Sequence, residues 1–152
     1  MWKKLPQNFI LHIYGTGTYK EYVEGEAKKN SNIEFYGFKP QEIIFQDILK
    51  SVAVVITSEC YETFGMGIPE SFSLATPVVC TNLGNSKLMI ERSKGGVVYR
   101  MNDFDSFYSS LDKVLENNFI YSKNAFSCFK KELNDKVNYE RLSDIYDKAK
   151  II

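Results

Sequence analysis

Five short apolar runs, separated by stretches with helical periodicity, constrain the fold more than any other feature of this sequence. The runs have the length of strands and occupy residues 9–14, 33–37, 52–56, 77–80 and 96–99. Between them, apolar side chains recur at helical spacing, first around residues 19–27 and then around residues 44–49. Strands that alternate with helices pair in parallel, because a crossover helix returns the chain to the same end of the sheet. The sequence therefore predicts an α/β fold: a Rossmann-like, doubly wound parallel sheet of about five strands with helices on both faces.

After the last apolar run the pattern becomes purely helical. Asn102 or Asp103 can cap a helix whose apolar stripe includes Phe107. Two further helical segments are expected at about 122–134 and 139–150. The sheet should therefore be followed by extra C-terminal helices.

Size and charge limit the classes of protein to which the chain can belong. Its 152 residues are near the usual size of one domain, and 44% of them are hydrophobic, so we expect a single globular domain over residues 1–152. Nineteen basic residues balance nineteen acidic ones, which leaves no overall field to attract nucleic acid or an anionic membrane. No apolar run has the length of a signal or membrane-spanning segment. Three cysteines without a CxxC pair favour a reducing compartment, and we expect a cytoplasmic protein.

In open parallel sheets, ligands bind beyond the carboxyl ends of the strands, so the loops that follow the strands are the first candidates for a binding site. These loops are "GTGTYK", "GFKP", "TSECYETFGMGIPE" and "TNLGNSK". The first has Gly15 and Gly17 but Lys20 where a dinucleotide fingerprint needs a third glycine. Two interpretations stay open: a turn that needs the conformational freedom of glycine, or a close approach of ligand phosphates to Gly15.

His12 is the only histidine and lies within an expected strand. An ordinary structural or surface imidazole is favoured there over a catalytic base or a metal ligand. No metal site and no Ser-His-Asp triad can be assembled around it, which weakens any interpretation as a hydrolase. We expect no metal cofactor.

The third loop combines several features of a binding site. Gly65 and Gly67 allow the backbone to turn tightly out of the third strand, so that the amides of Phe64, Gly65 and Met66 can point toward an oxygen-rich ligand. Pro69 then falls in the first turn of a helix, where its missing N–H costs little. The loop is thus expected to lead directly into a helix.

Glu62 and Glu70 stand eight positions apart around this turn. Glu70 lies in the first helical turn, where a carboxylate is favoured by the helix dipole and can accept two hydrogen bonds from the vicinal diol of a ribose. Glu62, on the preceding loop, could meet a hydroxyl-rich or cationic group of the same ligand. The alternative is a capping glutamate and a solvent-facing loop glutamate.

The stretch "TSECYETFGMGIPESFSLATPVVCTNLGN" resembles the core motif of the family 4 retaining glycosyltransferases, also called glycosyl transferases group 1, which have the GT-B fold. In that family two glutamates eight positions apart bracket a turn, and Glu62, Thr63, Phe64, Gly65 and Glu70 occupy the matching positions here. "FILHIYGTGTYKEYV", "IEFYGFKPQEIIFQDILKSVAVVITS", "GGVVY" and "VNYERLSDIYDKA" are similar to its flanking segments. The resemblance covers almost the whole chain and implies one half of a GT-B fold.

The resemblance also implies a reaction, the transfer of a sugar from a nucleotide-sugar to a hydroxyl acceptor with retention, in cell-envelope polysaccharide or glycolipid synthesis. Glu62 would be the catalytic candidate by positioning the sugar, and Glu70 would bind the ribose. The resemblance implies two further sets of contacts, one with the sugar and phosphates of the donor and one with its base. They are Gly15, Phe64, Gly65 and Met66 for the sugar and phosphates, and Tyr36, Gly37 and Phe38 for the base.

This chain departs from the family pattern in two respects. Thr63 stands where most relatives have glycine, which adds a side chain beside the sugar. Relatives also begin with a further strand, an Arg and a Lys that grip the phosphates, and a separate acceptor-binding domain, and none of these is matched here. We therefore expect a fragment that is inactive alone, with rearranged strand pairing, strand exchange or a homo-oligomer at the resulting gap. The alternative function is a non-catalytic module that binds a nucleotide or a sugar phosphate.

Overall fold

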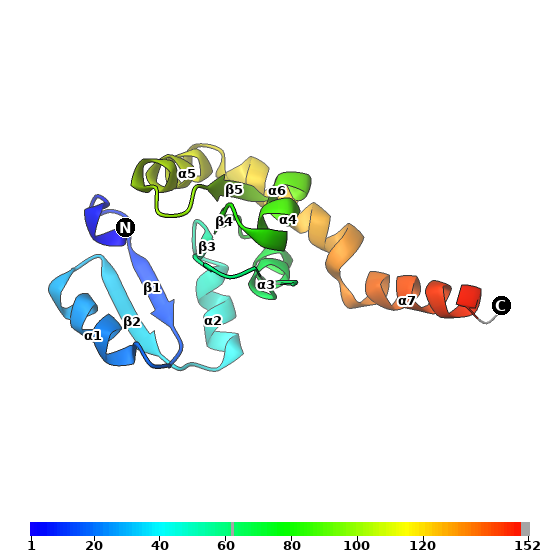
Figure 1. Cartoon of the computed structure of the whole chain (residues 1–152), viewed down its shortest axis with the longest axis horizontal. Helices are drawn as coiled ribbons and strands as arrows, with labels where there is room; N and C mark the ends of the chain where they lie inside the picture. The colour runs from blue at the N-terminus through cyan, green and yellow to red at the C-terminus, as the bar shows by residue number, and fades with distance from the viewer. Residues whose placement is uncertain (62, 150–152) are drawn as a thin grey trace. The chain divides into compact units, whose positions relative to one another are not determined.

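The computed structural model describes residues 1–61 and 63–149 of the chain (Figure 1). The chain forms two compact units, Met1–Asp47 and Ile48–Ile152, which are described separately below. The expectation of a single domain stays a prediction. No helix in the described residues is both long and apolar enough to cross a bilayer.

The first unit contains a pair of parallel strands flanked by helices. Its elements are the short helix η1 (Trp2–Lys4), β1 (Leu11–Tyr14), α1 (Lys20–Lys29), β2 (Ile33–Gly37) and α2 (Gln41–Ile48), whose last residue belongs to the second unit. Leu11 is opposite Ile33, and the register shifts at the end of β1, where Tyr14 is opposite Gly37. Helix α1 packs against β2. The two strands therefore end side by side at their carboxyl ends.

The second unit contains a three-stranded parallel sheet in the order β3-β4-β5. Its strands are β3 (Val54–Ile56), β4 (Val78–Thr81) and β5 (Gly96–Tyr99). Crossover helices α3 (Gly67–Ser73) and α4 (Gly84–Ser93) connect them, as parallel pairing requires. The helical segments that follow are α5 (Phe104–Glu116), α6 (Asn118–Cys128), the π-helical turn η2 (Phe129–Leu133) and α7 (Asp135–Ala149).

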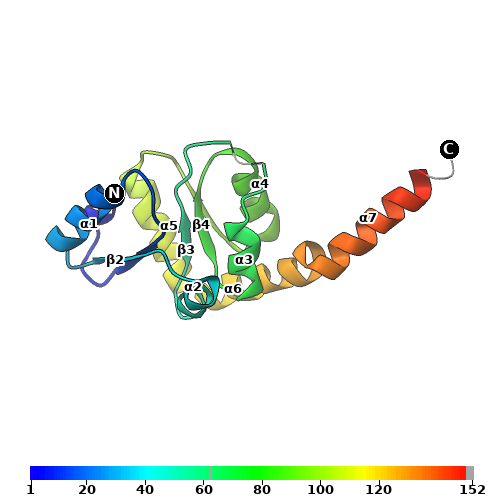
Figure 2. The same cartoon turned by 90° about the horizontal axis from the view of Figure 1, so that it is seen from below.

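Strand β4 forms the centre of the core, because all four of its residues are buried. Val78 and Cys80 face a cluster that includes Phe72 of α3, Ile90 of α4 and Ala125 of α6. The opposite face is covered by α5, whose Phe107 ring lies 5.0 Å from the ring of Tyr99. Figure 2 shows α3 and α4 on one side of this sheet and α5 on the other. This double coverage explains why the strand is a continuous apolar run in the sequence.

The predicted α/β class is confirmed, and each of the five expected strands is present. They form two sheets rather than one, because in the described residues β1 pairs with β2 alone and β3 pairs with β4 alone. The strand exchange or oligomer that the sequence analysis expected at a gap in the sheet stays a prediction.

Three helices, α4, α6 and α7, begin earlier than the sequence indicated, and the cap of α5 is one of its two expected candidates. Asp103 caps α5, since its Oδ1 accepts a 2.8 Å hydrogen bond from Ser106 N, and Asn102 does not. Helices α6 and α7 each begin four residues earlier than expected. The early start of α7 is stabilised by Asn134, because its Oδ1 accepts a 3.0 Å hydrogen bond from Val137 N in the first turn. The loop expected at 81–87 ends at Gly84, where α4 begins.

Candidate functional site

The candidate site of the second unit lies on the loop that leaves the carboxyl end of β3 and enters α3. Glu62, the catalytic candidate, lies outside the described residues. Gly65 has a φ of 70°, in the left-handed region that glycine adopts without strain, and its carbonyl accepts from Ile68 N at 3.0 Å. Pro69 falls in the first turn of α3, as predicted. The turn and the helix start are therefore formed as the sequence indicated.

The side chains around this turn are accessible to a ligand. Phe64 and Met66 are 44% and 62% exposed. Glu70 lies in the first turn of α3 and is partly exposed, and its backbone N–H donates to Met66 O at 3.2 Å. The structure thus brings Phe64, Gly65, Met66 and Glu70 together at one end of the β3-β4-β5 sheet.

Three polar side chains, to which the sequence analysis gave no role, form hydrogen bonds between the segments at this end of the sheet. Asn85 Nδ2 donates to the carbonyl of Thr63 at 2.9 Å, and Thr81 Oγ1 donates to the carbonyl of Ser58 at 2.9 Å. Asn82 Oδ1 accepts from the backbone N–H of Met101 at 3.0 Å. Thr81 ends β4, and Asn82 and Asn85 come soon after it in "TNLGN", which is the signal that could have identified them. They hold the loop after β3 and the segment after β5 to the end of β4.

The candidate residues of the first unit gather at the ends of β1 and β2. Gly15 N donates to the carbonyl of Gly37 at 2.8 Å, and both glycines have positive φ values, 120° and 65°. Side chains would be strained in these conformations, so glycine is required by the backbone alone. Phe38 follows on the link to α2 and is 75% exposed. Gly15, Gly37 and Phe38 are therefore neighbours, and the turn interpretation of Gly15 accounts for its presence without a ligand.

Tyr36 points into a polar and aromatic cluster on the first unit. Its ring stacks on Tyr14 with the centroids 5.1 Å apart and meets the edge of the His12 ring at 5.2 Å. Its hydroxyl donates to Glu34, and this hydrogen bond is the main cause that raises the pKa of Tyr36 above its usual value. Neighbouring side chains therefore orient the ring of Tyr36 before any ligand binds.

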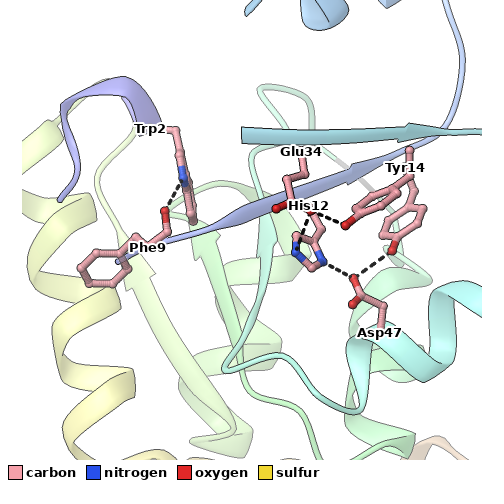
Figure 3. A network of polar contacts seen from close by, with 7 residues as sticks. Trp2, Phe9, His12, Tyr14, Glu34 and Asp47 are labelled. Atoms are coloured by element: carbon pink, nitrogen blue, oxygen red, sulfur yellow. Dashed lines mark hydrogen bonds and ion pairs between the residues drawn. The ribbon is translucent and has the colours of Figure 1, made fainter. Parts of the chain in front are cut away.

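His12 lies at the centre of this cluster (Figure 3). Its Nδ1 is 2.7 Å from Asp47 Oδ2, and its Nε2 is 3.7 Å from Glu34 Oε2. Tyr14 donates to the same Asp47 oxygen at 3.0 Å; burial, and then this hydrogen bond, raise the pKa of Tyr14 to about 12. We call His12, Tyr14, Glu34, Tyr36 and Asp47 the His12 network. In residues 1–61 and 63–149, no three His, Cys, Asp or Glu side chains are grouped to hold a metal ion.

Comparison with known proteins decides the family. The sequence profile of the glycosyl transferases group 1 matches residues 1–132, which is most of the chain. The chain belongs to this family. The resemblance inferred from the glutamate motif is thereby confirmed.

Individual relatives agree with this assignment. Over 105 residues the chain is 27% identical to the Escherichia coli UDP-Gal:alpha-D-GlcNAc-diphosphoundecaprenol alpha-1,3-galactosyltransferase, covering 66% of this chain and 26% of that protein. The structure of Anabaena HepE in complex with UDP matches 96% of the chain with a TM-score of 0.79 at 17% identity. The structure of WaaG, a glycosyltransferase involved in lipopolysaccharide biosynthesis, matches 93% with a TM-score of 0.71 at 18% identity. These likenesses confirm the glycosyltransferase fold class.

The chain spans only part of each of these proteins. It covers 43% of the HepE chain and 40% of the WaaG chain. The activities of the longer proteins are therefore properties of those proteins, and the function of this chain is a separate proposal.

Proposed function

We propose that this chain is the donor-binding part of a retaining glycosyltransferase that moves a sugar from a nucleotide-sugar to a hydroxyl acceptor. The observation that carries the proposal is the turn after β3, which presents exposed Phe64 and Met66 beside Glu70 in the first turn of α3. In a member of this family, that arrangement suits the sugar, phosphates and ribose of a donor. The HepE complexes with UDP and with UDP-glucose support the choice of ligand class.

Each candidate residue has a distinct role in this proposal. Glu70 accepts hydrogen bonds from the ribose diol, and Glu62 orients the donor sugar at the bond that breaks. The amides of Phe64, Gly65 and Met66 face the developing charge on the diphosphate. On the first unit, Gly15 approaches the diphosphate, and the residues proposed to flank the base are Tyr36, Gly37 and Phe38.

In this proposal the acceptor binds to a domain outside this chain, so sugar transfer requires the longer enzyme. The reaction takes place at the cytoplasmic face of the membrane. It includes no metal cofactor, and UDP should bind equally well with a chelator or with Mg²⁺. An envelope glycan or glycolipid as the product is supported by the relatives, whose names include a galactosyltransferase acting on a diphosphoundecaprenol and a lipopolysaccharide enzyme. The alternative is a non-catalytic nucleotide-binding module, which an adjoining reading frame for an acceptor domain would disfavour.

The test is calorimetry of the full chain with the diphosphates of uridine, guanosine and adenosine. If Glu70 binds the ribose, Glu70→Ala weakens binding of the preferred diphosphate by about 1 to 3 kcal/mol, the scale of hydrogen bonds to a charged group. Glu116→Ala removes an exposed carboxylate at the end of α5 in the same unit and serves as the control. Equal binding by the two variants would refute the ribose role, and no binding by the unmodified chain would refute donor binding by this chain.

A further inference from the structure

Helix α6 has an exposed side that combines apolar and basic side chains. Along α6 and the start of η2, residues 118–131, six residues are exposed, three of them apolar and three of them lysines. They are Phe119, Ile120, Phe126, Lys123, Lys130 and Lys131. Their spacing places them on one side of the helix, which turns once in about 3.6 residues. We call these six residues the α6 face.

The opposite side of α6 is fixed in the core. Ala125 is fully buried, and a Cβ on Gly95 would lie only 2.9 Å from its Cα, so the helix packs closely against the turn before β5. Asn124 Nδ2 donates to the carbonyl of Lys94 at 3.0 Å. Helix α6 therefore cannot rotate to bury Phe119, whose side chain is 81% exposed. Apolar side chains on both sides are typical of a helix that is covered on both sides.

The charge of the α6 face limits what can cover it. Residues 117–131 include three lysines and no acidic residue, in a chain with nineteen basic and nineteen acidic residues overall. The flanking carboxylates are those of Glu116, the last residue of α5, and Glu132, which is paired with Arg92 of α4. Lys130 lies over the ring of Phe126, with its Nζ 5.1 Å from the ring centroid. The face is therefore both apolar and positively charged.

Helix α7 provides a contrast. It also has exposed apolar side chains, which are those of Tyr139, Leu142, Ile145 and Tyr146. Its residues 135–149, however, include four acidic and three basic residues. Lys136 and Lys148 are each paired with a carboxylate one turn away. An anionic surface would therefore be attracted by the α6 face and not by α7.

We propose that the α6 face docks on the surface of an anionic phospholipid bilayer. Phe119, Ile120 and Phe126 enter the boundary between headgroups and acyl chains, and the lysine side chains extend from it to place their ammonium groups beside phosphates. Binding to nucleic acid depends mainly on charge, and three lysines on a chain without net charge supply little of it. A bilayer accounts for the apolar side chains as well as the basic ones.

The expected contributions follow from the two parts of the face. A lysine beside an anionic leaflet strengthens binding roughly fivefold, so loss of all three should weaken binding roughly 100-fold. Removal of the Phe119 ring from the apolar boundary should weaken it about tenfold. All of these side chains are exposed, so their replacement should have little effect on folding.

The first experiment is flotation of the full chain with vesicles of equal parts phosphatidylcholine and phosphatidylglycerol. The chain should float with these vesicles, and less with pure phosphatidylcholine or at about 1 M salt, where charges are screened beyond about 3 Å. The test variant combines Lys123→Gln, Lys130→Gln and Lys131→Gln and should bind roughly 100-fold more weakly.

The control variant loses the same net charge at three lysines that are already paired with carboxylates. It combines Lys20→Gln, Lys136→Gln and Lys148→Gln, and it should float as the unmodified chain does. Equal losses in the two triple variants would overturn the proposal, as would an unmodified chain that does not float.

The second experiment tests which side chains enter the bilayer. The fluorescence of Phe119→Trp should shift to shorter wavelength when the anionic vesicles are added, and brominated lipid should quench it. Leu142→Trp, on α7, should not respond, and the unmodified chain, whose only tryptophan is Trp2, gives the background. Equal responses of the two variants would contradict docking through α6.

Two other occupants of the face would also be recognised. Binding to single-stranded RNA without binding to vesicles would assign the face to nucleic acid. A dimer that is lost in Phe119→Ser, again without vesicle binding, would assign it to a second copy of the chain. Either result would overturn the proposal. Neither experiment uses a nucleotide, and α6 contains none of the proposed donor contacts, so failure of docking and failure of donor binding are separate results.

Discussion

Replacing Gly96 by alanine should strongly destabilise the second unit, because β4 and β5 approach each other too closely for a side chain there. Gly96 is the first residue of β5 and lies opposite Val78 of β4. A Cβ atom on Gly96 would lie 1.8 Å from the carbonyl oxygen of Val78. Nonbonded Cβ contacts stay beyond 3.0 Å, so the strands would have to separate by about 1.2 Å (3.0 minus 1.8).

The cost follows from the two interactions that this separation disturbs. Overpacking a rigid core costs about 1 to 3 kcal/mol. The 3.2 Å hydrogen bond from Val78 N to the carbonyl of Gly95 would lengthen, at a further cost of about 1 kcal/mol. We expect Gly96→Ala to lower the free energy of unfolding by about 2 to 4 kcal/mol. That is a large fraction of the stability of an ordinary domain.

A matched control lies in the same unit. A Cβ on Gly67, at the start of α3, would meet only Ile56 Cδ1 at 3.7 Å, which is an ordinary contact. Gly67→Ala should leave stability unchanged or raise it by up to about 1 kcal/mol, because alanine restricts the unfolded chain. The contrast separates a packing effect from a general effect of glycine replacement.

The assay is urea unfolding followed by circular dichroism, with amide hydrogen exchange to assign the loss of stability to β4. Hydrogen exchange is needed because a chain with two compact units need not unfold in one step. Equal unfolding midpoints for Gly96→Ala and Gly67→Ala, with unchanged protection of the β4 amides, would refute the packing argument.

Two other predictions concern single side chains. The hydrogen bond from Ser106 N lowers the pKa of Asp103, and the contact with Arg100 lowers it further. The charged Asp103 side chain therefore stabilises α5 above about pH 4, and this stabilisation is lost as the pH falls through the folded-state pKa of Asp103. Asp103→Ala should therefore lower the Tm at neutral pH and have little effect at about pH 2, and an equal loss at both values would contradict the capping role. Burial raises the pKa of the Cys80 thiol to about 12, whereas Cys60 is exposed, so a thiol reagent at neutral pH should modify Cys60 and leave Cys80 unmodified until the chain unfolds. Mass spectrometry would show this order, and equal rates for the two thiols would contradict it.

Much of the candidate site could be predicted from local sequence patterns. The turn around Gly65, the position of Pro69 and the place of Glu70 in the first turn of α3 all depend on residues within a few positions of one another. Backbone conformation and capping act over this range, so the sequence was sufficient for them. The role of Glu70 as a ribose ligand stays a prediction, as does that of Glu62.

The side-chain hydrogen bonds that hold the site together could not be predicted from local sequence patterns. Asn85 binds the carbonyl of Thr63, which lies 22 positions earlier in the chain. His12 and Asp47 meet across 35 positions, and the sequence analysis treated His12 as an isolated imidazole. These pairs depend on strand register and helix packing, which a pattern of hydrophobic residues does not specify at the level of single atoms.

The sequence by itself determined the kinds of element, their order and the family, because periodicity, turn residues and the glutamate motif are local properties of the chain. The tertiary structure decided how the strands divide into two sheets, which face of β4 each helix covers and which polar side chains meet. The physical reason is the range of the interactions. Backbone preferences act between neighbours, whereas burial and side-chain hydrogen bonds need residues that are distant in the chain to come together.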